Sequence, residues 1–191
     1  MRRMLHSSTY NVIALVGLSG AGKSTVGRLL AGRLGWELHD TDALVERRSG
    51  RRIAAIFAED GEARFRDLEA EALRGALAAS PCVVSTGGGI VLRGENRELL
   101  RRQAFVVWLD APTDTLVARL QAHDEERPLL AADPRARLEA LRAERSALYA
   151  EIADLVVPTG GRDVAAICDE VLQAHRAHLS REAESPAEER K

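Results

Sequence analysis

The sequence predicts an α/β fold built around a mostly parallel, doubly wound sheet. Two observations support this class. Short apolar runs alternate with longer stretches of helical composition, and a glycine-rich loop directly follows the first apolar run. The expected strands are 12–16, 36–39, 82–85, 105–109 and 154–157.

Length and composition indicate a single globular domain. The chain has 191 residues, 46% of them hydrophobic, and no run reaches the roughly 18 uninterrupted apolar residues of a membrane span. A net charge of −2 argues against a nucleic-acid surface, which would need a strong basic excess. The two cysteines, Cys82 and Cys168, are far apart and are expected to be buried free thiols in a reducing cytoplasm. We therefore expect a cytoplasmic protein that binds neither nucleic acid nor membrane.

The glycine-rich loop at 17–25 fits G-x-x-x-x-G-K-[ST] at every fixed position and precedes a helix expected over 26–34. Between a strand and a helix, such a loop binds the phosphates of a nucleoside triphosphate through backbone N–H groups and the helix N-terminus. We expect Lys23 to reach the β- and γ-phosphates and the Ser24 hydroxyl to bind Mg²⁺. A strand-to-helix turn with a coincidental lysine is the less favoured alternative. The expected nucleotide contacts are Gly20, Ala21, Gly22, Lys23, Ser24 and Thr25.

Aspartates end two of the expected strands. Asp40 and Asp42 follow the second strand, and ligands in an open α/β sheet bind outside the carboxyl ends of the strands, so this pair should lie beside the phosphate loop. Asp40 is the candidate for contacting Mg²⁺ through water. Asp42 could take a proton from a substrate hydroxyl or could cap the next helix. Asp110 competes for the metal, but the Ala111-Pro112 after it favours an N-cap.

A long helical stretch over 43–79 separates the second and third strands, with breaks expected at Ser49-Gly50 and Asp60-Gly61. This is more chain than a crossover needs, which indicates a separate substrate-holding lobe. Arg66 and Glu69 lie three residues apart and are neighbours on one helix face. A guanidinium can bind a carboxylate through two hydrogen bonds, so Arg66 is a candidate substrate ligand, with a surface ion pair as the alternative.

Three consecutive glycines follow the third strand: Gly87, Gly88 and Gly89. Adjacent glycines lose backbone entropy on folding and pack no side chain, so they usually mark a place where a ligand approaches the backbone closely. A flexible loop is the alternative. The phosphate loop at the same edge of the sheet makes the binding interpretation the favoured one.

Two further arginines lie in the second half of the chain. Arg127 lies in 121–133, a polar, proline-broken stretch with the composition of a mobile lid, and Arg145 lies in a helix expected over 134–151. Either could be an ordinary surface charge. A last helix is expected over 164–178. The charged residues after it are expected to be disordered.

These motifs together resemble the shikimate kinase family, within the nucleoside-monophosphate-kinase-like group of P-loop proteins. The resemblance covers nearly all of residues 11–175. Its motifs are G-L-S-G-A-G-K-S-T at 17–25, D-T-D at 40–42, I-F-x-x-x-G-E-x-x-F-R-x-x-E at 56–69, S-T-G-G-G at 85–89, R-P-L-L at 127–130 and R-x-x-x-Y at 145–149. The first motif alone indicates only the superfamily, whereas the set in this order and spacing is highly specific.

The resemblance implies a three-layer P-loop fold with strand order 2-3-1-4-5 in a kinase domain over 11–179. It implies a shikimate-binding helical lobe at about 42–72 and a lid at about 121–133. Residues 1–10 would be a flexible lead and 180–191 a disordered tail. The implied reaction transfers the γ-phosphate of ATP to the 3-hydroxyl of shikimate, a step in chorismate and aromatic amino acid biosynthesis. Mg²⁺ is the implied cofactor, and the implied oligomeric state is a monomer.

On the acceptor side, the resemblance assigns Asp42 to the shikimate hydroxyls and to the role of catalytic base. Arg66 and Arg145 would hold the substrate carboxylate. The three glycines at 87–89 would line the site.

On the nucleotide side, the resemblance assigns Lys23 to the phosphates and Arg119 to a position near the adenine. Arg127 would reach the transferred phosphate and bind ATP from the lid, which makes it catalytic together with Lys23. Ser24 would bind Mg²⁺ directly and Asp40 through water.

Other functions remain open from the residues alone. A gluconate-type sugar-acid kinase would use the same chemistry, because paired arginines and an acidic D-T-D suit any hydroxylated carboxylate. A nucleoside monophosphate kinase is a weaker candidate. A non-catalytic nucleotide-binding module is the third, and the intact Lys23, Ser24, Asp42 and Arg127 argue against it.

Overall fold

The structure, a computed structural model, describes residues 11–122 and 133–184. Nearly all of the expected lid, including Arg127, lies outside these residues, as do the expected N-terminal lead and the end of the tail. Among the described residues, no helix is both long enough and apolar enough to cross a membrane.

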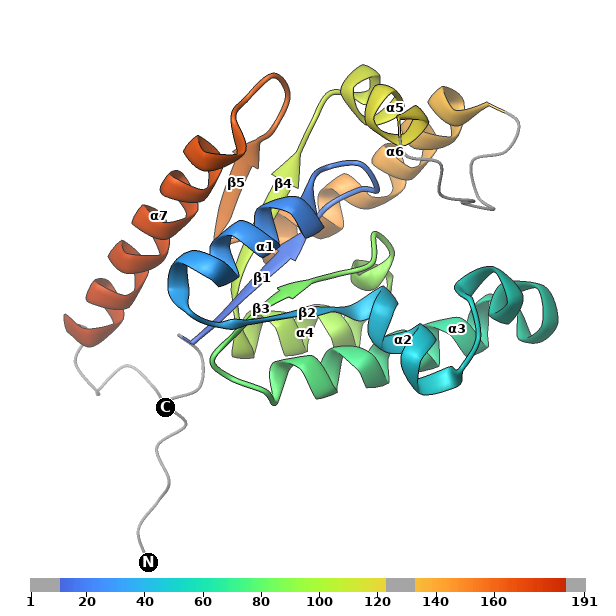
Figure 1. Cartoon of the computed structure of the whole chain (residues 1–191), viewed down its shortest axis with the longest axis horizontal. Helices are drawn as coiled ribbons and strands as arrows, with labels where there is room; N and C mark the ends of the chain where they lie inside the picture. The colour runs from blue at the N-terminus through green and yellow to red at the C-terminus, as the bar shows by residue number, and fades with distance from the viewer. Residues whose placement is uncertain (1–10, 123–132, 185–191) are drawn as a thin grey trace, which may run out of the picture.

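A parallel sheet of five strands in the order β2-β3-β1-β4-β5 forms the centre of the described chain, as predicted (Figure 1). Its strands are β1 (Val12–Val16), β2 (Glu37–Asp40), β3 (Cys82–Ser85), β4 (Phe105–Asp110) and β5 (Leu155–Pro158). Every residue of β1 is completely buried, because helices cover both faces of this central strand. Burying one Leu or Ile side chain in this way stabilises the fold by about 1.5–3 kcal/mol.

Helices form the outer two of three layers. They are α1 (Lys23–Leu34), α2 (Thr41–Ser49), α3 (Ile53–Leu77), the 3₁₀ turn η1 (Ile90–Leu92), α4 (Gly94–Gln103), α5 (Thr113–Gln121), α6 (Pro134–Ile152) and α7 (Val164–Glu184). Helices α1 and α7 pack together on one face, while α4, α6 and the end of α3 pack against β3 and β4 on the other (Figure 1).

Helices α2 and α3 form the predicted lobe, which projects beyond the sheet in Figure 1. A small separate core holds it together, made of Val45, Ile56, Phe65 and Ala72. The expected break in α3 occurs at Gly61, whose φ of 81° and ψ of 175° are non-helical. Glycine adopts a positive φ without the steric penalty of a side chain, so the helix direction can change here. The lobe therefore has a small core of its own and joins the sheet through α2, which follows β2 directly, and through α3, which contacts β3.

The helix boundaries differ from expectation at two places. Helix α1 begins at Lys23 rather than at 26. The prediction began too late because the first turn of the helix is polar and carries no apolar periodicity. Helix α7 continues to Glu184, which corrects the expectation that 180–184 belongs to a disordered tail. No glycine or proline lies between Val164 and Pro186, so nothing interrupts the helix in this stretch. Pro186 itself disfavours helical geometry in the residue before it.

Both cysteines are buried free thiols, as predicted. Burial raises the pKa of Cys82 to about 11, and burial also raises the pKa of Cys168. Neither thiol is therefore activated as a nucleophile, because the thiolate is the reactive form.

Candidate active site

The phosphate loop leads from β1 into α1. Gly22 takes the N-cap position of α1 with a φ of 98°, a left-handed conformation that glycine adopts readily. The Lys23 ammonium donates to the carbonyl oxygens of Gly17 at 2.8 Å and Leu18 at 2.9 Å. The cation therefore lies over the loop, beside the backbone N–H groups at the start of α1.

Ser24, Asp40 and Ser85 meet beside this loop. The Ser24 hydroxyl donates to Asp40 Oδ2 at 3.1 Å, and its oxygen lies 3.3 Å from that of Ser85. Asp40 Oδ1 accepts from the backbone N–H groups of Asp42 at 3.1 Å and Ala43 at 3.3 Å. Asp40, and not Asp42, therefore caps α2, which removes the capping alternative for Asp42. Sequence reasoning missed Ser85, whose signal is a polar residue ending a buried strand.

The donor set of Ser24 and Asp40 fits Mg²⁺. In the described part of the chain, no group of three or more His, Cys, Asp or Glu is placed to hold a metal ion. Mg²⁺ does not need such a cage, because it keeps several waters and binds through one or two protein oxygens together with substrate phosphates. Ser24 and Asp40 supply those oxygens next to the phosphate loop.

Asp110 is not an N-cap, contrary to expectation. Pro112 takes the N-cap position of α5 without a side-chain hydrogen bond, and Asp110 is the last residue of β4. Its carboxylate accepts from Arg142 Nη1 of α6 at 2.8 Å, and Arg142 also donates to the carbonyl of Ala111. An arginine thus already neutralises this aspartate. That pairing favours Asp40 over Asp110 as the metal partner.

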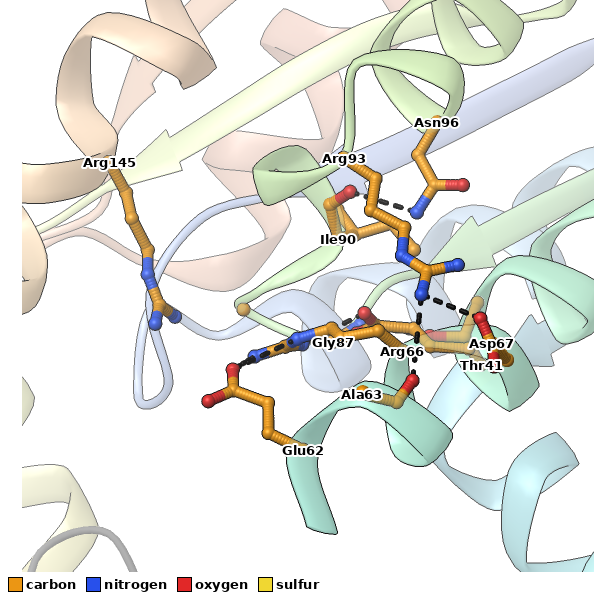
Figure 2. Close-up of polar contacts among 12 residues, drawn as sticks. Thr41, Glu62, Ala63, Arg66, Asp67, Gly87, Ile90, Arg93, Asn96 and Arg145 are labelled. Carbon is orange, nitrogen blue, oxygen red and sulfur yellow. Dashed lines mark hydrogen bonds and ion pairs between the residues drawn. The ribbon is translucent and has the colours of Figure 1, made fainter.

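Arg66 lies between two carboxylates of the lobe. Its Nη1 donates to Glu69 Oε2 at 2.8 Å. Its Nη2 donates to Glu62 Oε1 at 2.9 Å (Figure 2). Glu69 is 1% exposed, and its Oε1 has no hydrogen-bond partner among the described residues. The expected neighbours Arg66 and Glu69 therefore form a buried ion pair rather than a solvent-exposed one.

The charges of three arginines converge on Glu69. Burial raises the pKa of the Glu69 carboxyl above its usual value, while the guanidinium groups of Arg66, Arg145 and Arg93 act to lower it. Burial lowers the pKa of Arg66, but Glu69 and Glu62 more than offset this and raise it overall. Arg66 therefore stays cationic in its buried position. The guanidinium groups of Arg66 and Arg145 can each bind a carboxylate ligand through paired hydrogen bonds.

The triple-glycine loop lies directly against these groups. A Cβ on Gly87 would lie 2.6 Å from Asp42 Oδ1 and 2.7 Å from Glu69 Oε1. A Cβ on Gly89 would lie 2.2 Å from Arg66 Nη1. A side chain at 87 or 89 would therefore displace the carboxylates of Asp42 and Glu69 or the guanidinium of Arg66, which favours glycine at both positions. The loop after β3 and the lobe thus meet at Asp42 and Arg66.

Arg145 reaches the same region from α6 and is 7% exposed. Its Nε donates to Glu144 Oε2 at 3.1 Å. Figure 2 shows Arg145 and Arg66 extending from different helices. Arg145 and Arg66 both act electrostatically on the buried Glu69 carboxyl. The structure therefore brings Asp42, Arg66, Arg145 and the three glycines together.

Arg119 connects the phosphate loop with the segment after β5. Its Nη1 donates to the carbonyl of Gly20 at 3.1 Å, and its Nη2 donates to the carbonyl of Thr159 at 2.8 Å. The buried Thr159 hydroxyl in turn donates to the carbonyl of Ala21 at 3.1 Å. Sequence reasoning missed Thr159, since it lies far from the loop in the chain and belongs to no motif. Arg119 is thus held at the phosphate loop, as its assignment to the nucleotide requires.

Comparison with known proteins identifies the family. The sequence model of the family described as shikimate kinase matches residues 19–176. A shikimate kinase of Symbiobacterium thermophilum is 49% identical over 163 residues, covering 84% of this chain and 94% of that protein. One from Chromobacterium violaceum is 50% identical over 151 residues, covering 78% and 82%. The structure of shikimate kinase from Acinetobacter baumannii in complex with shikimate matches with a TM-score of 0.84 and 36% identity, covering 90% of this chain and 96% of that chain. The chain belongs to the shikimate kinase family.

Proposed function

We propose that this ATP-dependent kinase transfers the γ-phosphate of ATP to the 3-hydroxyl of shikimate, giving shikimate 3-phosphate and ADP. The observation that carries the proposal is the convergence of Asp42, Arg66, Arg145 and the triple-glycine loop at one place beside the phosphate loop. A relative that shares 36% of its residues was solved in complex with shikimate. A carboxylate next to two arginines suits an acceptor that carries both hydroxyls and a carboxylate.

Asp42 is the proposed base on the acceptor. A carboxylate beside a substrate hydroxyl binds it and takes its proton as the phosphoryl group transfers. Arg66 and Arg145 hold the acceptor carboxylate from two sides, which fixes the hydroxyl in line with the γ-phosphate. Glu69 keeps Arg66 in place through the buried ion pair.

Lys23 and the phosphate loop hold the β- and γ-phosphates in the proposed mechanism, and Arg119 holds the loop from the nucleotide side. Arg127 would contact the transferred phosphate from the lid. Closure of that lid would exclude water from the γ-phosphate and prevent its hydrolysis. Ser24, and Asp40 through water, would hold Mg²⁺, which neutralises phosphate charge when bound.

The proposed active unit is a cytoplasmic monomer, with the kinase domain at 11–179 and ATP and shikimate as its small-molecule partners.

An acceptor comparison tests the proposal. Release of ADP from ATP and Mg²⁺ is measured with shikimate, gluconate, AMP, CMP and UMP as acceptors, and turnover is expected with shikimate alone. The family match and the relative solved with shikimate support this acceptor, because an arginine fork by itself binds carboxylate and phosphate alike. Turnover with gluconate or a nucleotide in place of shikimate would keep the chemistry and reject the acceptor.

The metal assignment predicts different effects for two aspartates. Asp40→Asn is expected to raise the Mg²⁺ concentration that gives half the maximal rate by about 10- to 100-fold. The reason is that a partner that orients the metal's ligands loses its charge. Asparagine still caps α2, so the helix start is kept. Asp110→Asn is the matched control and should leave the Mg²⁺ titration unchanged, since Arg142 occupies that carboxylate. The reverse pattern in the two titrations would transfer the metal role to Asp110.

A further inference from the structure

The triple-glycine loop has no side chains of its own with which to hold its place beside the acceptor residues. Its position depends on hydrogen bonds from neighbouring elements to its backbone. Within the loop, the Ile90 N–H donates to the Gly87 carbonyl at 3.2 Å and the Leu92 N–H donates to the Gly89 carbonyl at 3.0 Å. These local bonds set the shape of the turn, but they do not fix where the turn lies relative to the lobe or to α6.

Thr41 holds the loop from the lobe side. The Gly87 N–H donates to Thr41 Oγ1 at 2.9 Å, and Thr41 is completely buried (Figure 2). Thr41 is the first residue of α2 and directly precedes Asp42. This hydrogen bond therefore sets the separation between the Gly87 backbone and the carboxylate of Asp42.

Tyr149 holds the loop from the opposite side. Its phenol donates to the carbonyl of Gly88, and the side chain is 1% exposed. The ring packs against Trp108 of β4, with the centroids 5.7 Å apart, which fixes its orientation. Tyr149 lies one helical turn after Arg145 on α6, so the two side chains share a helix face. Burial raises the pKa of Tyr149, so the phenol stays protonated and remains a donor.

We propose that Thr41 and Tyr149 are positioning residues that hold the triple-glycine loop from two sides and thereby set the distance between Asp42 and Arg145. Thr41 directly precedes Asp42, and Tyr149 follows Arg145 by four residues. Thr41 bonds to Gly87 and Tyr149 to the next glycine of the loop, Gly88. Neither is assigned a contact with the acceptor. The inference rests on the proposed function, because Asp42 and Arg145 act on shikimate only if shikimate is the acceptor.

The test separates the hydroxyl of each residue from its packing. Thr41→Val keeps the shape but leaves the buried Gly87 N–H without its acceptor, and Tyr149→Phe keeps the ring but removes the donor. Each change is expected to raise the KM and the calorimetric Kd for shikimate by about 10-fold and to leave the KM for ATP unchanged. Thr41→Ser keeps the hydroxyl and is expected to restore the affinity for shikimate.

Thr159→Val is the matched control on the nucleotide side. It removes another buried threonine hydroxyl, but one that contacts Ala21 and Arg119 instead of the glycine loop. It should raise the KM for ATP and leave that for shikimate unchanged. Thermal unfolding of each variant shows how much stability the substitution costs.

Three results would overturn parts of this account in different ways. If Thr41→Val and Tyr149→Phe lower only the melting temperature and keep the KM and Kd for shikimate, both residues are merely structural and the inference fails. If they raise the KM for ATP as much as that for shikimate, the loop does not act on the acceptor alone. If the unaltered chain neither binds nor phosphorylates shikimate, the proposed function fails and the inference fails with it.

Discussion

Replacing Asp42 with asparagine is expected to lower kcat for shikimate by about 10²- to 10⁴-fold, the range for loss of a positioned acid–base group. Asparagine has nearly the same shape and can still hydrogen-bond a hydroxyl, but it cannot take its proton. The KM for ATP should stay unchanged, because Asp42 lies beside Gly87 and not in the phosphate loop. Steady-state ADP release at saturating ATP measures the effect.

A distant aspartate provides the control for Asp42→Asn. Asp169 on α7 pairs with Arg33 at the surface, and Asp169→Asn should keep full activity. Wild-type kcat in Asp42→Asn would show that Asp42 only binds or supports structure.

Replacing Arg145 with alanine is expected to raise the KM for shikimate by about 100-fold, because a hydrogen-bonded charge contact to a buried ligand contributes about 1.5–3 kcal/mol. Arg145→Lys should recover only part of this, since an ammonium cannot reproduce the planar guanidinium fork. Arg145 is a cleaner probe than Arg66, whose removal would leave Glu69 as a buried carboxylate without its paired cation.

Methyl shikimate completes the test of Arg145. The ester lacks the carboxylate charge, so it should be a poor substrate for the unaltered enzyme, and Arg145→Ala should lower its kcat/KM far less than that of shikimate. Arg102→Ala on α4, where Arg102 forms only a surface pair with Glu98, should behave like the unaltered enzyme. An equal loss for acid and ester in Arg145→Ala would contradict a carboxylate contact.

The architecture was predictable because it depends on local signals. Buried parallel strands read as short apolar runs, and the expected runs matched the observed strands to within one residue at each end. The meeting of D-T-D with the triple glycine was predictable as well, since the carboxyl ends of the parallel strands β2 and β3 lie at one edge of the sheet. The lobe was visible as more helical sequence than a crossover requires.

Contacts between elements distant in sequence were not predictable. Asp40 caps α2 while accepting from Ser24, and its local pattern could not distinguish it from Asp42 as the cap. Asp110 carried an N-cap pattern, but an arginine from α6 binds it instead. Thr159 belongs to no motif, and its role depends on β5 placing it next to the phosphate loop. Side-chain partners across the fold, and not propensities, decided each of these cases.

The most direct test of the central claim is the stoichiometry of the reaction with ATP, Mg²⁺ and shikimate. Phosphorus NMR and mass spectrometry of the product are predicted to show one shikimate 3-phosphate for each ADP released, and Lys23→Ala is predicted to form neither product at a comparable rate. ADP formed together with free phosphate and unmodified shikimate would contradict the account, as would a phosphate on any hydroxyl other than the 3-hydroxyl.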